Sequence, residues 1–260
     1  MSENVQSAKN PKLSGAANEF VEIVKTVVYA LAIALFLRVL FFQPFTIPSA
    51  SMEPNLYEGD YIIVSKFSYG YSRHSIPFSP NVFQGRVMES QAQRGDVVVF
   101  KLPSDGRTDY VKRVVGIGGD RVQMRNGLLY VNDKLVQRDA MSPVTTDPGY
   151  GPLIEVAQFQ ERLESGKIYR TQDQGPDNPL DNTVEEVVPE GHYFMMGDNR
   201  DNSLDSRVSP LENGVGMVPA ENLVGKAQII LLSWHPKASI FKPWTWVLDA
   251  RPSRFFKILK

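Results

Sequence analysis

Residues 26–42 read TVVYALAIALFLRVLFF, a run of apolar side chains in which Arg38 is the only charge. As a helix this run is about 25 Å long, slightly less than the roughly 30 Å of a bilayer's hydrocarbon core. Glu22 and Lys25, which precede it, suit the headgroup level and extend the helix across the remaining distance. Arg38 lies near the other end, from which its long side chain reaches the interface. The sequence therefore predicts a transmembrane anchor over residues 20–42.

Two other interpretations of this run stay open. One is a buried core helix, although so long an apolar run without amphipathic polar positions argues against it. The other is a cleavable secretory signal, since the small residues Ser49 and Ala50 follow, although leader and apolar stretch both exceed the usual lengths. Residues 1–19 are polar and are expected to form a disordered tail. Their Lys9 and Lys12 favour a cytoplasmic N-terminus, with the rest of the chain beyond the membrane.

After the anchor the sequence is typical of a β-protein. Short apolar runs rich in β-branched and aromatic residues, too short for buried helices, recur along it. They are residues 61–64, 97–100, 111–115, 128–131 and 229–232. Asn126-Gly127 predicts a two-residue β-hairpin. Residues 140–182 are expected to be loops with one hairpin at Ser165-Gly166, and helical turns within residues 154–163 stay open.

The composition excludes several classes of function. A formal net charge of -1 gives no broad basic surface for nucleic acid. The absence of cysteine removes disulfides, thiol nucleophiles and thiolate metal sites. The three histidines, His74, His192 and His235, are not at metal-ligand spacing from one another. We therefore expect no metal and no cofactor.

Aromatic and basic residues alternate near the C-terminus. They are Phe241, Trp244, Trp246, Phe255 and Phe256 with Lys242, Arg251, Arg254, Lys257 and Lys260. Such a mixture suits a membrane interface that carries anionic lipid. An equally weighted alternative packs the aromatic residues on the β core and leaves the basic ones in solvent.

The first candidate for chemistry is Pro48-Ser49-Ala50-Ser51-Met52-Glu53-Pro54, close behind the anchor. A serine becomes a good nucleophile only when a base removes its proton. The Ser-x-x-Lys arrangement of penicillin-binding proteins is absent, because Pro54 occupies the lysine position. The base must come from elsewhere in the chain, and Ser49 and Ser51 as plain turn residues remain the alternative.

The second candidate is Asp109-Tyr110-Val111-Lys112-Arg113-Val114-Val115. Successive side chains of a strand point to opposite faces, so each face would hold one cation among apolar neighbours. Burial lowers the pKa of a lysine toward the range that a general base needs, whereas arginine stays charged. Two surface cations on an edge strand are the alternative.

The third candidate is GDNRDNSLDSR at residues 197–207, which follows the apolar residues 193–196. A loop of this kind supplies ion pairs that fix its own shape and a hydroxyl that orients a neighbour. Calcium binding is disfavoured because the closing glutamate of an EF-hand loop is missing. A solvated loop is the alternative.

In this order behind an apolar anchor, the segments resemble the bacterial type I signal peptidases, which are serine proteases with a serine–lysine dyad. The resemblance rests on the anchor and on residues 47–54, 94–100, 109–113, 116–120, 197–207 and 218–225. These stretches cover a minority of the chain but span nearly its whole length.

The resemblance implies that Ser51 is the nucleophile and Lys112 its general base. Ser203 would hydrogen-bond Lys112, and the Ser49 hydroxyl with the Ser51 backbone N–H would stabilise the oxyanion. The supporting residues would be Asp205 and Arg207, as an ion pair, together with Asp198 and Arg200. Shallow pockets for small substrate residues would be lined by Phe45, Ile47, Pro48, Met52, Leu56, Val99, Tyr110 and Val111.

The resemblance also implies a mainly β fold. An antiparallel catalytic core, at residues 43–121 and 191–260, would be interrupted by an inserted β region at residues 122–190. The substrates would be preprotein signal peptides. The chain would act as a monomer anchored once in the inner membrane, with its catalytic domain on the periplasmic side.

Other functions remain open at this point. A self-cleaving Ser–Lys repressor peptidase shares the Ser-Met and Val-Lys-Arg patterns, but its DNA-binding domain has no counterpart here. A specialised pilus-processing Ser–Lys peptidase is a narrower alternative. From a different class, a non-catalytic anchored β-domain could bind exported proteins or pilus subunits.

Overall fold

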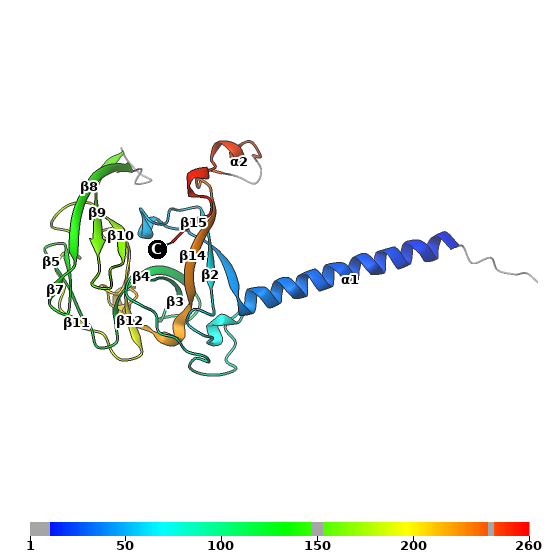
Figure 1. Cartoon of the computed structure of the whole chain (residues 1–260), viewed down its shortest axis with the longest axis horizontal. Coiled ribbons are helices and arrows are strands. Elements are labelled where there is room, and N and C mark those ends of the chain that lie inside the picture. The colour runs from blue at the N-terminus through cyan, green and yellow to red at the C-terminus, as the bar shows by residue number, and fades with distance from the viewer. Residues whose placement is uncertain (1–10, 147–152, 239–241, 260) are drawn as a thin grey trace, which may run out of the picture.

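A long helix leads into a β-rich body in the computed structural model, which describes residues 11–146, 153–238 and 242–259 (Figure 1). The helix is α1 (Pro11–Leu40), and its segment Ala17–Leu40 is long and apolar enough to cross a membrane. None of that segment is buried inside the protein, which argues against a core helix. The described part of the predicted disordered tail, residues 11–19, is helical. Proline suits the first turn of a helix, and the leucine, alanine and glutamate that follow favour helix.

The junction between α1 and the body is short. The helix ends at Leu40, two residues before the predicted end of the anchor, and β1 (Phe42–Thr46) begins after Phe41 alone. The Tyr71 hydroxyl donates to the Leu40 carbonyl at 2.6 Å, and the Lys66 N–H donates to the Phe41 carbonyl at 2.9 Å. These bonds satisfy carbonyls that a helix end leaves without intrahelical partners.

The largest sheet is antiparallel and has the order β1-β2-β14-β3-β4-β12-β13, with β15 added on β14. Its other strands are β2 (Asp60–Ser65), β3 (Val97–Lys101), β4 (Asp109–Ile117), β12 (His192–Met196), β13 (Val218–Pro219), β14 (Leu223–Ser233) and β15 (Lys257–Ile258). Strands close to the anchor therefore pair with strands from the C-terminal quarter of the chain. The predicted apolar strands at residues 61–64, 97–100, 111–115 and 229–232 all lie in this sheet, and the mainly β prediction is confirmed.

Two smaller antiparallel sheets come from the middle of the chain. One contains β5 (Arg121–Arg125), β6 (Leu128–Val131), β7 (Lys134–Leu135) and β11 (Glu186–Val187); the other contains β8 (Gln137–Thr146), β9 (Ile154–Arg162) and β10 (Ile168–Asp173). Asn126-Gly127 closes the β5–β6 hairpin as predicted, with φ of 51° and 72°, which suit a primed turn. The hairpin at Ser165-Gly166 joins β9 to β10.

The prediction of loops over most of residues 140–182 is wrong, because β8, β9 and β10 occupy much of that range. The helical turns left open within residues 154–163 are likewise replaced by β9. Strand pairing stabilises this sheet although its strands carry many polar residues: β8 pairs with β9 over nearly its whole length. Pairing of this kind depends on the neighbouring strand and leaves little local signal.

Short helical segments fill the connections. They are the 3-10 helices Ala50–Met52, Arg73–Ser75, Pro210–Glu212, Ala220–Asn222 and Pro252–Arg254, and α2 (Thr245–Leu248). Near the C-terminus Trp244, Trp246 and Phe256 are exposed, whereas Arg254 is buried and pairs with Asp60 at 2.5 Å. That pair contradicts the idea that all basic residues there face solvent or lipid. Phe241 and Lys260 lie outside the described residues.

The hydrophobic core nearest the anchor positions residues 48–54, here called the serine segment. Met52 and Leu56, which follow Ser51, are 1% and 0% exposed and pack in one cluster with Ile62 and Val99. Burying such a side chain stabilises the fold by about 1.5–3 kcal/mol. The segment that carries Ser51 is therefore held against the main sheet.

Candidate active site

Ser51 lies on the 3-10 helix Ala50–Met52, which begins four residues after the end of β1, and is 9% exposed. Two contacts from residues 197–207, here called the polar run, fix this helix. The Asn199 N–H donates to the Ser51 carbonyl at 3.1 Å, and the Asn199 side-chain amide donates to the Ala50 carbonyl at 3.2 Å. The serine is thus held between the main sheet and the loop at residues 197–207.

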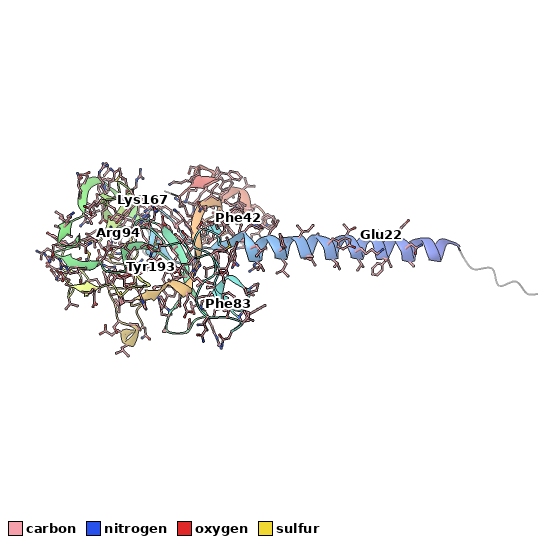
Figure 2. The ribbon with its side chains drawn as sticks, turned by 60° about the horizontal axis from the view of Figure 1, so that its bottom comes forward. Glu22, Phe42, Phe83, Arg94, Lys167 and Tyr193 are labelled. Carbon is pink, nitrogen blue, oxygen red and sulfur yellow. The ribbon has the colours of Figure 1, made fainter. Side chains whose placement is uncertain are left out.

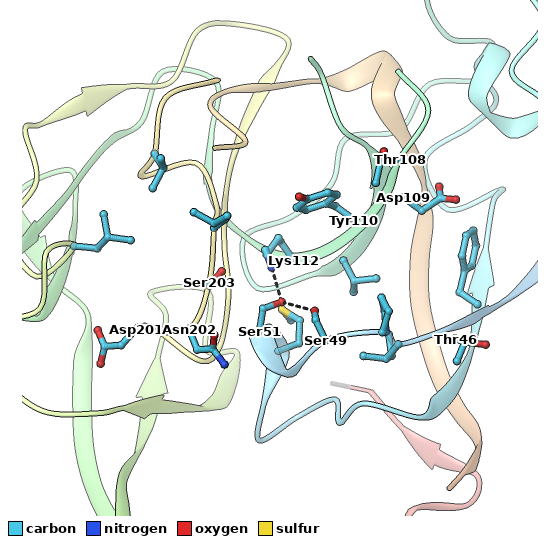
Figure 3. A pocket seen from close by; sticks show the side chains of 18 of the residues that line it. Thr46, Ser49, Ser51, Thr108, Asp109, Tyr110, Lys112, Asp201, Asn202 and Ser203 are labelled. Atoms are coloured by element: carbon cyan, nitrogen blue, oxygen red, sulfur yellow. Dashed lines mark hydrogen bonds between the residues drawn. The ribbon is translucent and has the colours of Figure 1, made fainter. Parts of the chain in front are cut away.

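Lys112 lies on β4, between β3 and β12, and is 3% exposed. Its Nζ donates to Ser51 Oγ at 2.5 Å (Figure 3). Burial lowers the pKa of Lys112 to about 8, and the nearby Arg207 acts in the same direction, whereas Asp205 and Asp198 oppose it. The alternative of surface cations on an edge strand is wrong, because β4 is internal and both Lys112 and Arg113 are buried.

Hydrogen-bond donors surround the serine hydroxyl. Ser49 Oγ lies 3.4 Å from Ser51 Oγ, as drawn in Figure 3. The backbone N–H of Ser51 belongs to the first turn of the 3-10 helix, where N–H groups have no intrahelical acceptor. A hydroxyl and an N–H from the first turn of a helix, close to one nucleophile, can together bind a developing negative charge.

The polar run at residues 197–207 forms the predicted ion pair between Asp205 and Arg207. Arg207 Nε lies 2.8 Å from Asp205 Oδ1, and the side chains are 1% and 0% exposed. Burial disfavours the ionised form of Asp205, but Arg207 and the Gly197 N–H outweigh burial and lower the pKa of Asp205. A negative charge is therefore fixed close to Lys112.

Asp198 and Arg200 do not pair with each other. Asp198 binds Arg113 through Nε–Oδ1 and Nη2–Oδ2 contacts of 2.7 and 2.8 Å. Arg200 pairs with Glu161 of β9 at 2.5 Å. Sequence reasoning missed the roles of Arg113 and Glu161 as supports, because both partners lie far away along the chain.

Ser203 differs from the expectation drawn from the resemblance. Its side chain is buried, but its Oγ has no hydrogen-bond partner among the described residues. The predicted hydrogen bond to Lys112 is therefore not formed in this structure, where Lys112 donates to Ser51 instead. Ser203 still lines the same cavity as Ser51 and Lys112, on the loop beside them (Figure 3).

Gly197 allows these groups to meet. A Cβ built on Gly197 would collide with the side chain of Ser203 and would lie 2.6 Å from the carbonyl oxygen of Ser51. No L-residue with a side chain fits there without moving one of the two serines. The glycine therefore sets how closely the polar run approaches the serine segment.

A cleft of about 880 Å³ opens over Ser51 and Lys112. Of the residues predicted to bind substrate, Phe45, Ile47, Pro48, Met52, Tyr110 and Val111 line it. Leu56 and Val99 do not, because both are fully buried in the core beneath. Sequence reasoning missed Asn178, Pro179, Leu180, Leu204 and Val208, which also line the cleft. The cleft is mainly apolar, which suits a peptide segment with small or apolar side chains.

Fold and site together define a membrane-anchored β-protein of the serine–lysine peptidase class. The model of the family "Signal peptidase, peptidase S26" matches residues 20–234. The chain belongs to this signal peptidase family.

Curated relatives agree with this assignment. The chain is 38% identical over 250 residues to signal peptidase I from Rickettsia typhi, covering 89% of this chain and 90% of that protein. Signal peptidase I from Rickettsia prowazekii matches at the same identity and coverage, and the one from Rickettsia akari matches at 36%. Among solved structures, a signal peptidase I from Enterococcus faecalis V583 is 26% identical. That match covers 53% of this chain and 97% of the other, with a TM-score of 0.30.

Proposed function

We propose that this chain removes N-terminal signal peptides from exported preproteins, with Ser51 as nucleophile and Lys112 as general base. The observation that carries the proposal is the 2.5 Å contact between Lys112 Nζ and Ser51 Oγ at the floor of the apolar cleft. The family assignment supports the same chemistry. It gives no support to the non-catalytic anchored domain or the specialised pilus-processing peptidase.

The reaction begins with an uncharged Lys112. With a pKa of about 8, about a tenth of the enzyme has a neutral Lys112 at pH 7. The neutral amine accepts the Ser51 proton as Ser51 Oγ attacks the scissile carbonyl carbon, and a tetrahedral intermediate forms. The resulting ammonium gives its proton to the leaving amine. Water then hydrolyses the acyl-enzyme, again with Lys112 as the base.

The oxyanion would be bound by the Ser49 hydroxyl and the Ser51 N–H. Loss of one such donor typically lowers kcat by about 10²–10³. We propose that Ser203 acts while Lys112 is protonated: its Oγ then accepts a hydrogen bond from the Lys112 ammonium. A buried hydroxyl without a partner in the resting enzyme is free to do so.

Specificity for small residues follows from the cleft wall beside Ser51. Ile47 and Met52 are 2% and 1% exposed, so the wall that they form is set by the core. Phe45, Tyr110 and Val111 also line the cleft. We propose that this wall accepts alanine or similarly small residues at the first and third positions before the cut.

Topology and assembly form part of the proposal. The N-terminus would lie in the cytoplasm and the β body on the periplasmic side of the inner membrane, because Lys9, Lys12 and Lys25 precede the apolar segment. The catalytic core would comprise residues 43–121 and 191–260, with residues 122–190 as an insertion. The enzyme would act as a monomer, in contact with the lipid bilayer and without nucleic acid.

A preprotein cleavage assay in detergent tests the proposal. Ser51→Ala and Lys112→Ala should each abolish cleavage, whereas the exposed Ser165→Ala and Lys134→Ala, as matched controls, should leave it unchanged. A metal chelator should not alter the rate. Full activity in either of the first two variants, with a folded protein, would disprove the assigned dyad.

A further inference from the structure

A second cavity of about 350 Å³ lies between the last turns of α1 and the β body. The residues that matter for its chemistry are Leu35 and Arg38 of α1 with His74, Phe78, Lys101 and Asp109 of the body. Arg38 is two residues before the end of α1, so along the axis it lies about 3 Å from that end. The cavity is therefore at the level where the anchor leaves the membrane.

The charged side chains that line this cavity are two cations, Arg38 and Lys101, and one carboxylate, Asp109. Lys101 Nζ contacts Asp109 at 2.9 Å, but Arg38 forms no ion pair with any residue that the structure describes. Lys66 is buried behind them and donates to the Ser75 carbonyl. Burial lowers the pKa of Lys66 to about 8, and Arg38 and Lys101 act in the same direction, whereas Asp109 opposes them. Two lining cations against one carboxylate leave the cavity with a net positive charge, which favours an anion.

The rim of the cavity is apolar. The Phe78 side chain is fully exposed, and Leu35 on the adjacent helix is 55% exposed. Phe42, which directly precedes the cavity-lining Gln43, is also exposed and stacks edge to face on Phe67, with ring centroids 5.5 Å apart. Figure 2 shows Phe42 where α1 meets the body. A small water-soluble anion gains nothing from such a rim, whereas an amphiphile contacts it with its acyl chains.

We propose that this cavity binds the headgroup of an acidic phospholipid. Its phosphodiester would lie between Arg38 and Lys101, and its acyl chains would run along Leu35 and past Phe78. Arg38 then has an anionic partner at the headgroup level, where a long basic side chain at a helix end normally finds one. Asp109 disfavours a more highly charged free anion in the same place. The site lies outside the Ser51–Lys112 pair, so it does not depend on the proposed reaction.

The test uses the full-length protein in vesicles of phosphatidylcholine, with spin-labelled phosphatidylglycerol or spin-labelled phosphatidylcholine as the probe. The immobilised fraction of each probe gives its relative association constant. We expect wild type to favour phosphatidylglycerol. Arg38→Gln and Lys101→Gln should each weaken that preference about fivefold, and the double variant should abolish it. Arg38→Lys should retain most of it, and the distant Lys134→Gln should retain all of it.

Three results would overturn the proposal. Equal immobilisation of the two probes by wild type would show a site without selectivity for charge. An unchanged preference for phosphatidylglycerol in the double variant would show that the lipid binds at another surface. Displacement of the labelled lipid by inorganic phosphate would assign the site to a free anion. Preprotein cleavage by Arg38→Gln in detergent should equal that of wild type, which separates this test from that of the catalytic proposal.

Discussion

Arg113 and Asp198 form a two-bonded ion pair inside the protein, with contacts of 2.7 and 2.8 Å and side chains only 2% and 1% exposed. The same carboxylate accepts a hydrogen bond from Asn55 at 2.7 Å, just beyond the serine segment. Asp198 therefore joins the three parts of the site: β4, the polar run and the segment that carries Ser51. Because Arg113 is the neighbour of Lys112, this pair also fixes the lysine's position along β4.

We expect Arg113→Leu to destabilise the protein by about 3–5 kcal/mol, because it leaves the Asp198 carboxylate buried without its cation. The double variant Arg113→Leu/Asp198→Leu should recover much of this loss, since no unpaired charge remains. Denaturant unfolding in detergent, followed by tryptophan fluorescence, measures both. Arg121→Leu, which breaks an exposed pair with Asp133, is the control and should cost less than about 1 kcal/mol. An Arg113→Leu effect no larger than the control would contradict the structural role.

The rate of cleavage should rise with pH. Only the neutral form of Lys112 accepts a proton, and its pKa is about 8, so kcat/KM should fall about tenfold for each pH unit below that value. The profile should level off above it. Measuring kcat/KM across this pH range gives the apparent pKa, and two substrates, one that dissociates slowly and one that dissociates rapidly, should give the same value. Circular dichroism at each pH checks the fold. A flat profile between about pH 6 and pH 8 would rule out Lys112 as the base.

Ser203→Ala should lower kcat about tenfold or more with little change in KM, because the Lys112 ammonium that forms on proton transfer loses a hydrogen-bond acceptor. The pH profile should also shift to lower pH, since the charged form of Lys112 is less stabilised. A purely structural role would leave the midpoint of that profile in place. Ser165→Ala on the exposed β9–β10 turn is the matched control and should match wild type in both respects.

Gly197→Ala should reduce kcat/KM about a hundredfold, because a displacement of about 1 Å at a reacting group has an effect of that size. The added methyl would meet Ser203 and the Ser51 carbonyl, and one of them must move. Gly15→Ala is the control, since nothing lies within 4 Å of the methyl it adds. Steady-state kinetics of both variants measure the effect. Wild-type kinetics in Gly197→Ala would show that the polar run has room to retreat without disturbing Ser51.

Apolar strands were predictable from the sequence because they leave a local pattern. Val97–Lys101 is buried over nearly its whole length, so it appears as a continuous β-branched run. The Asn126-Gly127 turn was predictable because few residue pairs adopt positive φ at both positions. The strand Gln137–Thr146 was missed because its own residues are largely polar and it is held in the extended conformation by pairing with β9.

The site was predictable in part for a related reason. Lys112 was predicted as a candidate base because an apolar strand places a cation against buried surface. Ser51 was predicted as the nucleophile through the resemblance. The partners of Asp198 and Arg200 could not be predicted, since Arg113 and Glu161 are 85 and 39 residues away in sequence. Such pairs depend on how separate strands are aligned in space. The residues at 178–180 were missed because their loop reaches the cleft from the middle of the chain.

The short junction at Phe41 ties the position of the cleft to that of the anchor helix. Because one residue separates helix from strand and hydrogen bonds hold both sides of it, the β body cannot swing freely about the anchor. A substrate must then extend its cut site from its own membrane segment by a matching length. We expect cleavage to depend on that length as well as on the side chains at the cut site. A suitable sequence that lies too near the substrate's membrane segment, or too far from it, should not be cleaved.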